Sequence, residues 1–85
     1  MNVLVYVIQS QSSGKIYIGQ TSNLPRRIEQ HNDPTCRITL HTKRNSGPWK
    51  VVHKEEYQTR AEAMRREKQL KSGKGREWLR NNILT

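Results

Sequence analysis

Apolar residues gather in six short segments of the 85-residue chain, and their spacing predicts three strands and three helices. Residues 3–9 (VLVYVIQ) are apolar on both alternating faces, which is typical of a central strand covered on both sides. Residues 12–14 (SSG) mark a turn, and residues 15–19 (KIYIG) form the returning strand of a hairpin. Residues 49–57 (WKVVHKEEY) supply a third strand.

Helical spacing follows directly after the hairpin. The sequence SNLP offers a capping serine or asparagine and a proline that suits a first helical turn. Leu24 and Ile28 form the apolar stripe of this helix, and Arg27 and His31 share its face. Arg26 is expected to point elsewhere, so the two adjacent arginines need not have the same role.

Two more helices are predicted in the C-terminal part of the chain. A Thr-Arg-Ala-Glu capping box begins a helix over residues 60–71. Residues 72–75 (SGKG) are expected to break the chain before a last short helix over residues 76–82. These elements predict a single domain over residues 1–85 of the α/β (α+β) class. Its small three-stranded, mainly antiparallel sheet is flanked by helices in the order ββαβαα.

The charge of the chain points to a polyanionic partner. It has 16 Lys and Arg against 7 Asp and Glu, a formal net charge of +9. This charge repels itself, and nucleic acid would relieve the repulsion. The alternatives are a basic protein that binds acidic partners, and ordinary solvated helix faces. Candidate contacts to the nucleic-acid backbone lie in the polar loop over residues 32–48 and at further basic positions. They are Lys15, Arg37, Lys43, Arg44, Arg66, Lys71 and Lys74.

The sequence predicts neither membrane insertion nor secretion. There is no apolar run of transmembrane length, and residues 1–8 resemble a strand rather than a signal peptide. Cys36 is the only cysteine, which excludes an internal disulfide and a Cys-based zinc site. We therefore expect a cytoplasmic protein with no membrane partner.

Glu67 needs an explanation, because it falls within an otherwise apolar helix stripe. Its neighbours on that stripe are Ala63, Met64 and Leu70. A carboxylate in such a place is costly unless it is paired, hydrogen-bonded or bound to a cation. A partly buried ion pair with Arg27 or with a nearby lysine is the structural explanation, and a functional carboxylate is the other.

Several motifs together resemble the GIY-YIG nuclease domain. They are VYV at residues 5–7, YIG at residues 17–19, an arginine eight residues further on with a histidine four after it, and a glutamate after EAxxR. The resemblance covers residues 3–78 and is similar to small stand-alone members and to the N-terminal part of an excinuclease. The chain departs from the family at Val5, where Gly-Ile would run, and at Gln20, where several members have a lysine.

The resemblance implies a set of catalytic residues. Tyr6 and Tyr17 would flank the reacting water, Arg27 would bind the scissile phosphate, and His31 would assist. Glu67 would be the only carboxylate ligand of Mg²⁺ or Mn²⁺. Whether the two tyrosines share a sheet face depends on the hairpin register, and which of them is the base stays open.

The implied function is a metal-dependent DNA endonuclease domain of the kind used in DNA repair. Nearby cations would favour a phenolate, so the rate is expected to rise toward alkaline pH. Specificity would come from the shape of branched or damaged DNA or from a protein partner. The alternative is a non-catalytic nucleic-acid-binding module of the same fold.

Overall fold

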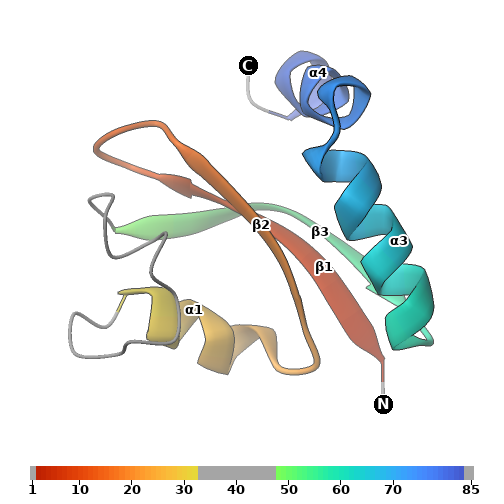
Figure 1. The fold of residues 1–85 in the computed structure, drawn as a ribbon. Coiled ribbons are helices and arrows are strands. Elements are labelled where there is room, and N and C mark those ends of the chain that lie inside the picture. Colours follow the sequence, from red (N-terminus) through yellow and green to blue (C-terminus); the bar gives the residue numbers. More distant parts are fainter. Residues whose placement is uncertain (1, 33–47, 84–85) are drawn as a thin grey trace.

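The computed structural model describes residues 2–32 and 48–83, and it consists of one sheet with helices on both faces (Figure 1). The element order ββαβαα and the antiparallel sheet confirm the predicted fold class. The expected basic loop lies almost entirely outside the described residues, with Arg37, Lys43 and Arg44. No helix in the described part of the chain is both long and apolar enough to cross a membrane. The elements are β1 (Val3–Ser10), β2 (Ile16–Thr21), α1 (Leu24–Asn32), β3 (Trp49–Tyr57), α3 (Arg60–Lys71) and α4 (Gly73–Asn82).

The strand order β2-β1-β3 places β1 at the centre of the sheet. In the hairpin, Tyr6 pairs with Gly19 and Ile8 pairs with Tyr17. Directly paired residues share a face of the sheet, and so do alternate residues of one strand. Tyr6 and Tyr17 therefore emerge on the same face, which the sequence alone left open.

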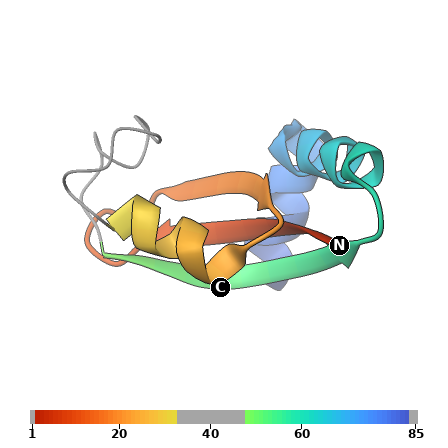
Figure 2. The ribbon, with the colours of Figure 1, turned by 90° about the horizontal axis from the view of Figure 1, so that it is seen from below.

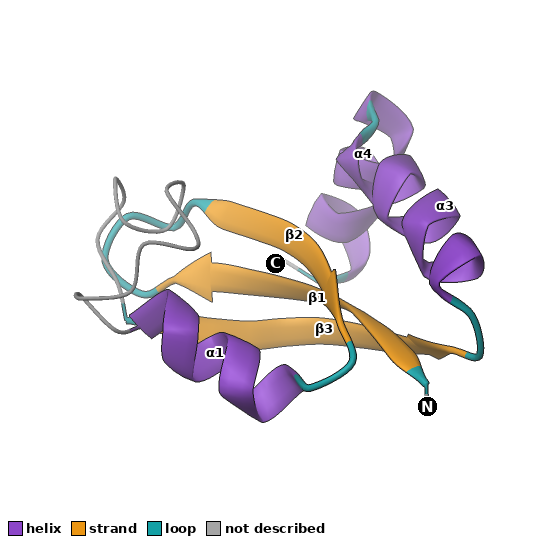
Figure 3. Ribbon diagram, turned by 60° about the horizontal axis from the view of Figure 1, so that its bottom comes forward, coloured by secondary structure: helices purple, strands orange, loops and turns teal. Residues whose placement is uncertain are grey.

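Helix α1 covers one face of the sheet, and α3 and α4 cover the other (Figures 2 and 3). Alternating residues of β1 supply both cores, as the doubly apolar pattern of this strand predicts. The core under α3 and α4 is formed by Val3, Val5, Val7, Ile18, Ala63, Leu70 and Leu79. The core under α1 is formed by Tyr6, Ile8, Leu24 and Trp49.

The junction between α3 and α4 is tighter than predicted. Helix α4 begins at Gly73, three residues before the predicted start, because Ser72 both ends α3 and caps α4. The Ser72 Oγ accepts a hydrogen bond from the Gly75 amide at 3.2 Å. A Cβ on Gly75 would lie 2.0 Å from the Gln69 carbonyl oxygen. Only glycine permits this close approach of the two helices, so the expected break is a single residue.

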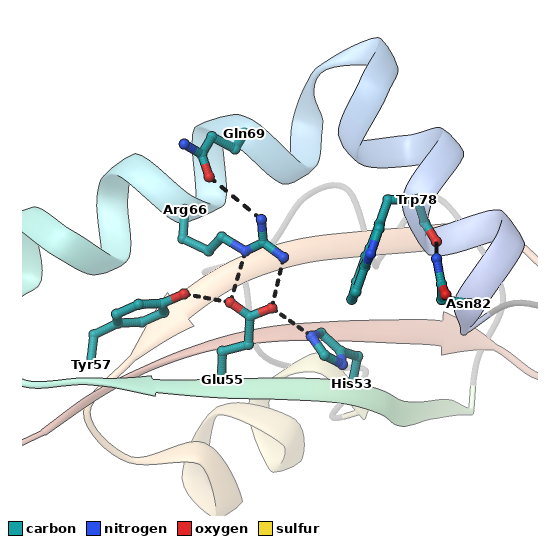
Figure 4. A network of polar contacts seen from close by, with 7 residues as sticks. All are labelled: His53, Glu55, Tyr57, Arg66, Gln69, Trp78 and Asn82. Carbon is teal, nitrogen blue, oxygen red and sulfur yellow. Dashed lines mark hydrogen bonds and ion pairs between the residues drawn. The ribbon is translucent and has the colours of Figure 1, made fainter.

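A polar network joins α3 to β3 (Figure 4). Arg66 donates Nε and Nη2 to the two oxygens of Glu55 at 2.8 and 3.0 Å. His53 Nε2 lies 2.7 Å from the same carboxylate, and the Tyr57 hydroxyl donates to it at 2.5 Å. The Arg66 guanidinium also stacks 5.3 Å from the ring centroid of Trp78. Arg66 was predicted to contact nucleic acid, but the structure commits it to this internal pair.

Glu55 is expected to contribute to stability through its depressed pKa. Burial alone would raise this pKa, but hydrogen bonds from Arg66, His53 and Tyr57 lower it to about 2. The stabilisation is therefore present above pH 4.5 and is lost as the pH falls toward 2. We expect Glu55→Gln to lower the free energy of unfolding at pH 7 by about 2–3 kcal/mol, as for a mostly buried ion pair that loses one charge.

Urea unfolding at pH 7, 4.5, 3 and 2 measures this effect. The loss of stability in acid should be shallower in the variant than in the wild type. Glu77→Gln, at an exposed position of α4, is the matched control and should stay within about 0.5 kcal/mol of the wild type. Equal acid sensitivity of Glu55→Gln and the wild type would contradict the role of this network.

Candidate active site

Four of the five predicted catalytic side chains lie together on the α1 face of the sheet. The rings of Tyr6 and Tyr17 have centroids 6.3 Å apart. The His31 ring lies 5.7 Å from the Tyr6 ring and 4.9 Å from the Tyr17 ring. Arg27 donates its Nε to the Tyr6 hydroxyl oxygen at 3.3 Å. The hairpin and the first helix thus bring these four groups into one cluster, whose catalytic roles stay predictions.

Helix α1 presents Arg27 and His31 to the sheet because they are one turn apart. The Asn23 side chain accepts from the Arg26 amide at 3.3 Å and caps the first turn, as expected from the sequence. His31 is buried, whereas Arg27 is only partly buried and borders solvent. The helix therefore holds an imidazole inside the protein and a guanidinium at its surface.

Gly19 makes space for the phenol of Tyr6. The paired strands place Gly19 directly opposite Tyr6, so the ring lies across the glycine toward the edge strand β2. A Cβ on Gly19 would lie 2.7 Å from the Tyr6 hydroxyl and 3.0 Å from a ring carbon of Tyr17. Any larger residue at this position would displace one of the two tyrosines.

The hydroxyl of Tyr6 connects Arg27 to His31. A guanidinium can only donate, so the Tyr6 oxygen accepts from Arg27. The same oxygen lies 2.8 Å from His31 Nε2, and Tyr6 donates its proton there when that nitrogen is unprotonated. Proton transfer along this chain needs no further group.

Burial raises the pKa of Tyr6 to about 12, although the hydrogen bond from Arg27 opposes it. The negative charges of Tyr17 and Glu67 raise this pKa slightly further. The expectation that nearby cations favour the phenolate is therefore wrong for Tyr6 within the protein alone. Burial would lower the pKa of Arg27, but the hydrogen bond to Tyr6 and the charge of Tyr6 outweigh this effect and raise it.

Glu67 lies apart from the other four residues, on α3 and thus on the opposite side of the sheet (Figure 3). Gln20, on the edge strand, donates its amide to Glu67 Oε2 at 3.2 Å. Lys71 Nζ lies 3.5 Å from Oε1, so the predicted ion pair is with a lysine of the same helix and not with Arg27. The side chain of Glu67 keeps 20% of its surface exposed. It remains accessible to a cation, and its charge reaches Tyr6 around the sheet edge.

The donor set around Glu67 is compatible with a hard, hydrated metal ion. Residues 2–32 and 48–83 contain no group of three or more His, Cys, Asp or Glu side chains that could hold a metal. Mg²⁺ commonly keeps several waters and binds through one or two carboxylates plus substrate phosphates. One accessible carboxylate beside a phosphate site therefore suffices for Mg²⁺ or Mn²⁺.

A polar groove of about 400 Å³ lies next to Arg27, between the end of β2, the first turns of α1 and the start of α3. Arg26 and Arg60 line it together with Arg27. Sequence reasoning missed both: Arg26 was expected to point elsewhere, and Arg60 joins the groove only because α3 begins near the end of β2. The pair of arginines in the first turn of α1 was the available signal.

The remaining predicted nucleic-acid contacts have different surroundings. Lys15 and Lys74 are exposed, and Lys71 is partly occupied by Glu67. Lys15 and Lys74 are therefore the described members of that set that remain exposed without an ion pair among the described residues.

The fold and this cluster define the class of the protein. The GIY-YIG catalytic domain matches residues 2–81, and the chain belongs to the GIY-YIG family. A 50-residue stretch is 42% identical to the structure-specific endonuclease subunit SLX1 of Podospora anserina, covering 56% of this chain but only 14% of that relative. The solution NMR structure of the UPF0213 protein BH0048 from Bacillus halodurans is 31% identical, with a TM-score of 0.56. That likeness covers 95% of this chain and 84% of the other.

Proposed function

We propose that this chain is a divalent-metal-dependent endonuclease domain that hydrolyses phosphodiester bonds in DNA. The observation that carries the proposal is the contact of Arg27 and His31 with one hydroxyl oxygen, that of Tyr6, in a member of the GIY-YIG family. The name of the SLX1 relative, a structure-specific endonuclease subunit, supports branched DNA as the substrate and a partner protein for specificity.

The exposure of the two tyrosines favours different roles for them. Tyr6 is fully buried, whereas Tyr17 is only partly buried and lies 4.9 Å from the His31 ring, measured between centroids. Tyr17 is therefore better placed to meet the attacking water, and Tyr6 holds Arg27 and His31 in position. Arg27 offers a planar fork of donors to the scissile phosphate, a geometry that lysine lacks.

Glu67 is the proposed ligand of the metal. A bound Mg²⁺ or Mn²⁺ would supply Lewis-acid stabilisation of the phosphate and of the leaving oxygen. Gln20 holds the carboxylate through a neutral amide, so its negative charge is retained for the cation. Lys71 is a half-exposed competitor that can move away, because its ion pair with Glu67 lies at the protein surface.

Incubation of the protein with supercoiled, branched and flap DNA tests the proposal. Cleavage is expected with Mg²⁺ or Mn²⁺ and is expected to stop when EDTA removes the metal. If every substrate is retarded on a gel but stays intact with each metal, the chain is a non-catalytic nucleic-acid-binding module. Cleavage that persists in EDTA would contradict the metal dependence while leaving the nuclease assignment.

The pH profile of cleavage tests the tyrosine base. A phenol titrating well above neutral pH gains about tenfold in phenolate per pH unit, so the rate should rise about tenfold per unit from about pH 7 to 9. If the base is Tyr6, with a pKa raised to about 12, no plateau is expected until the pH approaches that value. A plateau near the ordinary tyrosine value of about 10 would indicate another phenol. A flat profile would exclude a tyrosine base.

A further inference from the structure

The groove beside Arg27 gathers positive charge from two distant parts of the chain. Arg26 and Arg27 come from α1, and Arg60 comes from the first turn of α3. The residues that line the groove include no acid. Within the described residues, neither Arg26 nor Arg60 forms an ion pair with a carboxylate. Three guanidinium groups around one polar hollow repel each other, and an anion between them would relieve the repulsion.

The position of the groove indicates which anion it would take. It adjoins Arg27, which lies at the catalytic cluster, and Gln20, which holds Glu67. Arg60 Nη1 donates to Gln20 Oε1 at 3.2 Å, so one amide contacts both Arg60 and Glu67. A polyanion strand that reaches both Arg27 and Glu67 must therefore pass along the groove. Guanidinium groups match phosphate oxygens in geometry, which suits them to hold such a strand.

We propose that this groove is a phosphate-binding subsite in which Arg26 and Arg60 hold a backbone phosphate of DNA next to the scissile one. The inference deepens the proposed function, on which it rests for the place of the scissile phosphate at Arg27. Neither arginine is needed for the chemical step. Their contribution is to binding and to the register of the strand across the cluster.

Binding to a fluorescent branched DNA, measured by anisotropy in EDTA between about 50 and 200 mM KCl, tests the subsite. The variants are Arg26→Gln and Arg60→Gln, and Arg80→Gln on α4 is the control with the same loss of charge. Each groove variant should weaken binding about fivefold to tenfold, because a charge-assisted hydrogen bond is lost and part of it is replaced by water. Each should also lower the slope of log K against log salt by about 0.9, one duplex phosphate contact.

Three outcomes would overturn the inference. The first is binding by both groove variants that equals binding by Arg80→Gln, with circular dichroism showing that all three are folded. The second is unchanged salt slopes. The third is displacement of DNA from the wild type by millimolar inorganic phosphate at constant ionic strength, which would assign the groove to a free anion.

Failure of the proposed function gives a different result. If the wild type cleaves no DNA but the groove variants still bind more weakly with lower slopes, the subsite stands and the nuclease activity does not. If the wild type cleaves DNA and the groove variants bind like the control, only the subsite is overturned. Where cleavage occurs, the groove variants should raise KM more than they lower kcat, because uniform binding is what they lose.

Discussion

Glu67→Gln is expected to lower the rate of DNA cleavage by about 10³-fold, because several kcal/mol of metal-derived stabilisation are lost and each ~1.36 kcal/mol is tenfold in rate. The amide has nearly the same shape as the carboxylate and still accepts from Gln20. DNA binding in EDTA should stay within about twofold of the wild type, since the lost charge is negative and only locally placed. Rates at saturating Mg²⁺ and anisotropy in EDTA measure the two effects separately.

The matched control for this prediction is Glu77→Gln, which removes one carboxylate from an exposed position of α4. It should cleave at the wild-type rate. Thermal unfolding of both variants separates a catalytic carboxylate from a merely structural one. A Glu67→Gln protein that cleaves normally, whatever its stability, would show that this carboxylate holds no essential metal.

Gly19→Ala is expected to lower cleavage by about 10²-fold, the cost of moving a catalytic group by roughly 1 Å. The new methyl group would overlap the Tyr6 hydroxyl, which is buried and bonded to Arg27 and His31. The phenol must shift, and both contacts must shift with it. The free energy of unfolding should fall by about 1–3 kcal/mol, as for an overpacked core. Single-turnover kinetics and urea unfolding measure the two effects.

Gly73→Ala is the control for this change, because no atom lies within 4 Å of a Cβ at that position. Its cleavage rate should equal that of the wild type. Tyr6→Phe combined with Gly19→Ala sharpens the result, since it removes the hydroxyl that the methyl would strike. The stability loss of Gly19→Ala should be smaller in that background. Equal losses in both backgrounds would show that the methyl destabilises the hairpin and not the Tyr6 site.

Much of the fold follows from local patterns. The predicted bounds of β3 and α3 agree with the structure, because a continuous apolar pattern and a capping box mark their ends. The helix period likewise places Arg27 and His31 on one face. The start of α4 was wrong, because a single residue, Ser72, ends one helix and caps the next. Local composition at SGKG indicates a break but not its length.

Arg66 and Glu67 show where local reasoning failed. They are adjacent in the sequence, and the same pattern predicted a free cation at one and a buried acid at the other. Arg66 is instead bound to Glu55, a residue of β3 that no local spacing connects to it. Glu67 remains accessible beside the edge strand. Which of two neighbouring charges meets solvent depends on the element packed against the helix.

The sequence by itself determined the elements, their order and the family, because strand and helix periods and short motifs are properties of neighbouring residues. Only the tertiary structure decided that Tyr6 and Tyr17 share a face, that Tyr6 binds both Arg27 and His31, and that Arg60 joins Arg26 in one groove. These relations depend on strand register and on the packing of helices onto the sheet. A shift of one residue in the register would reverse the faces without changing the local pattern.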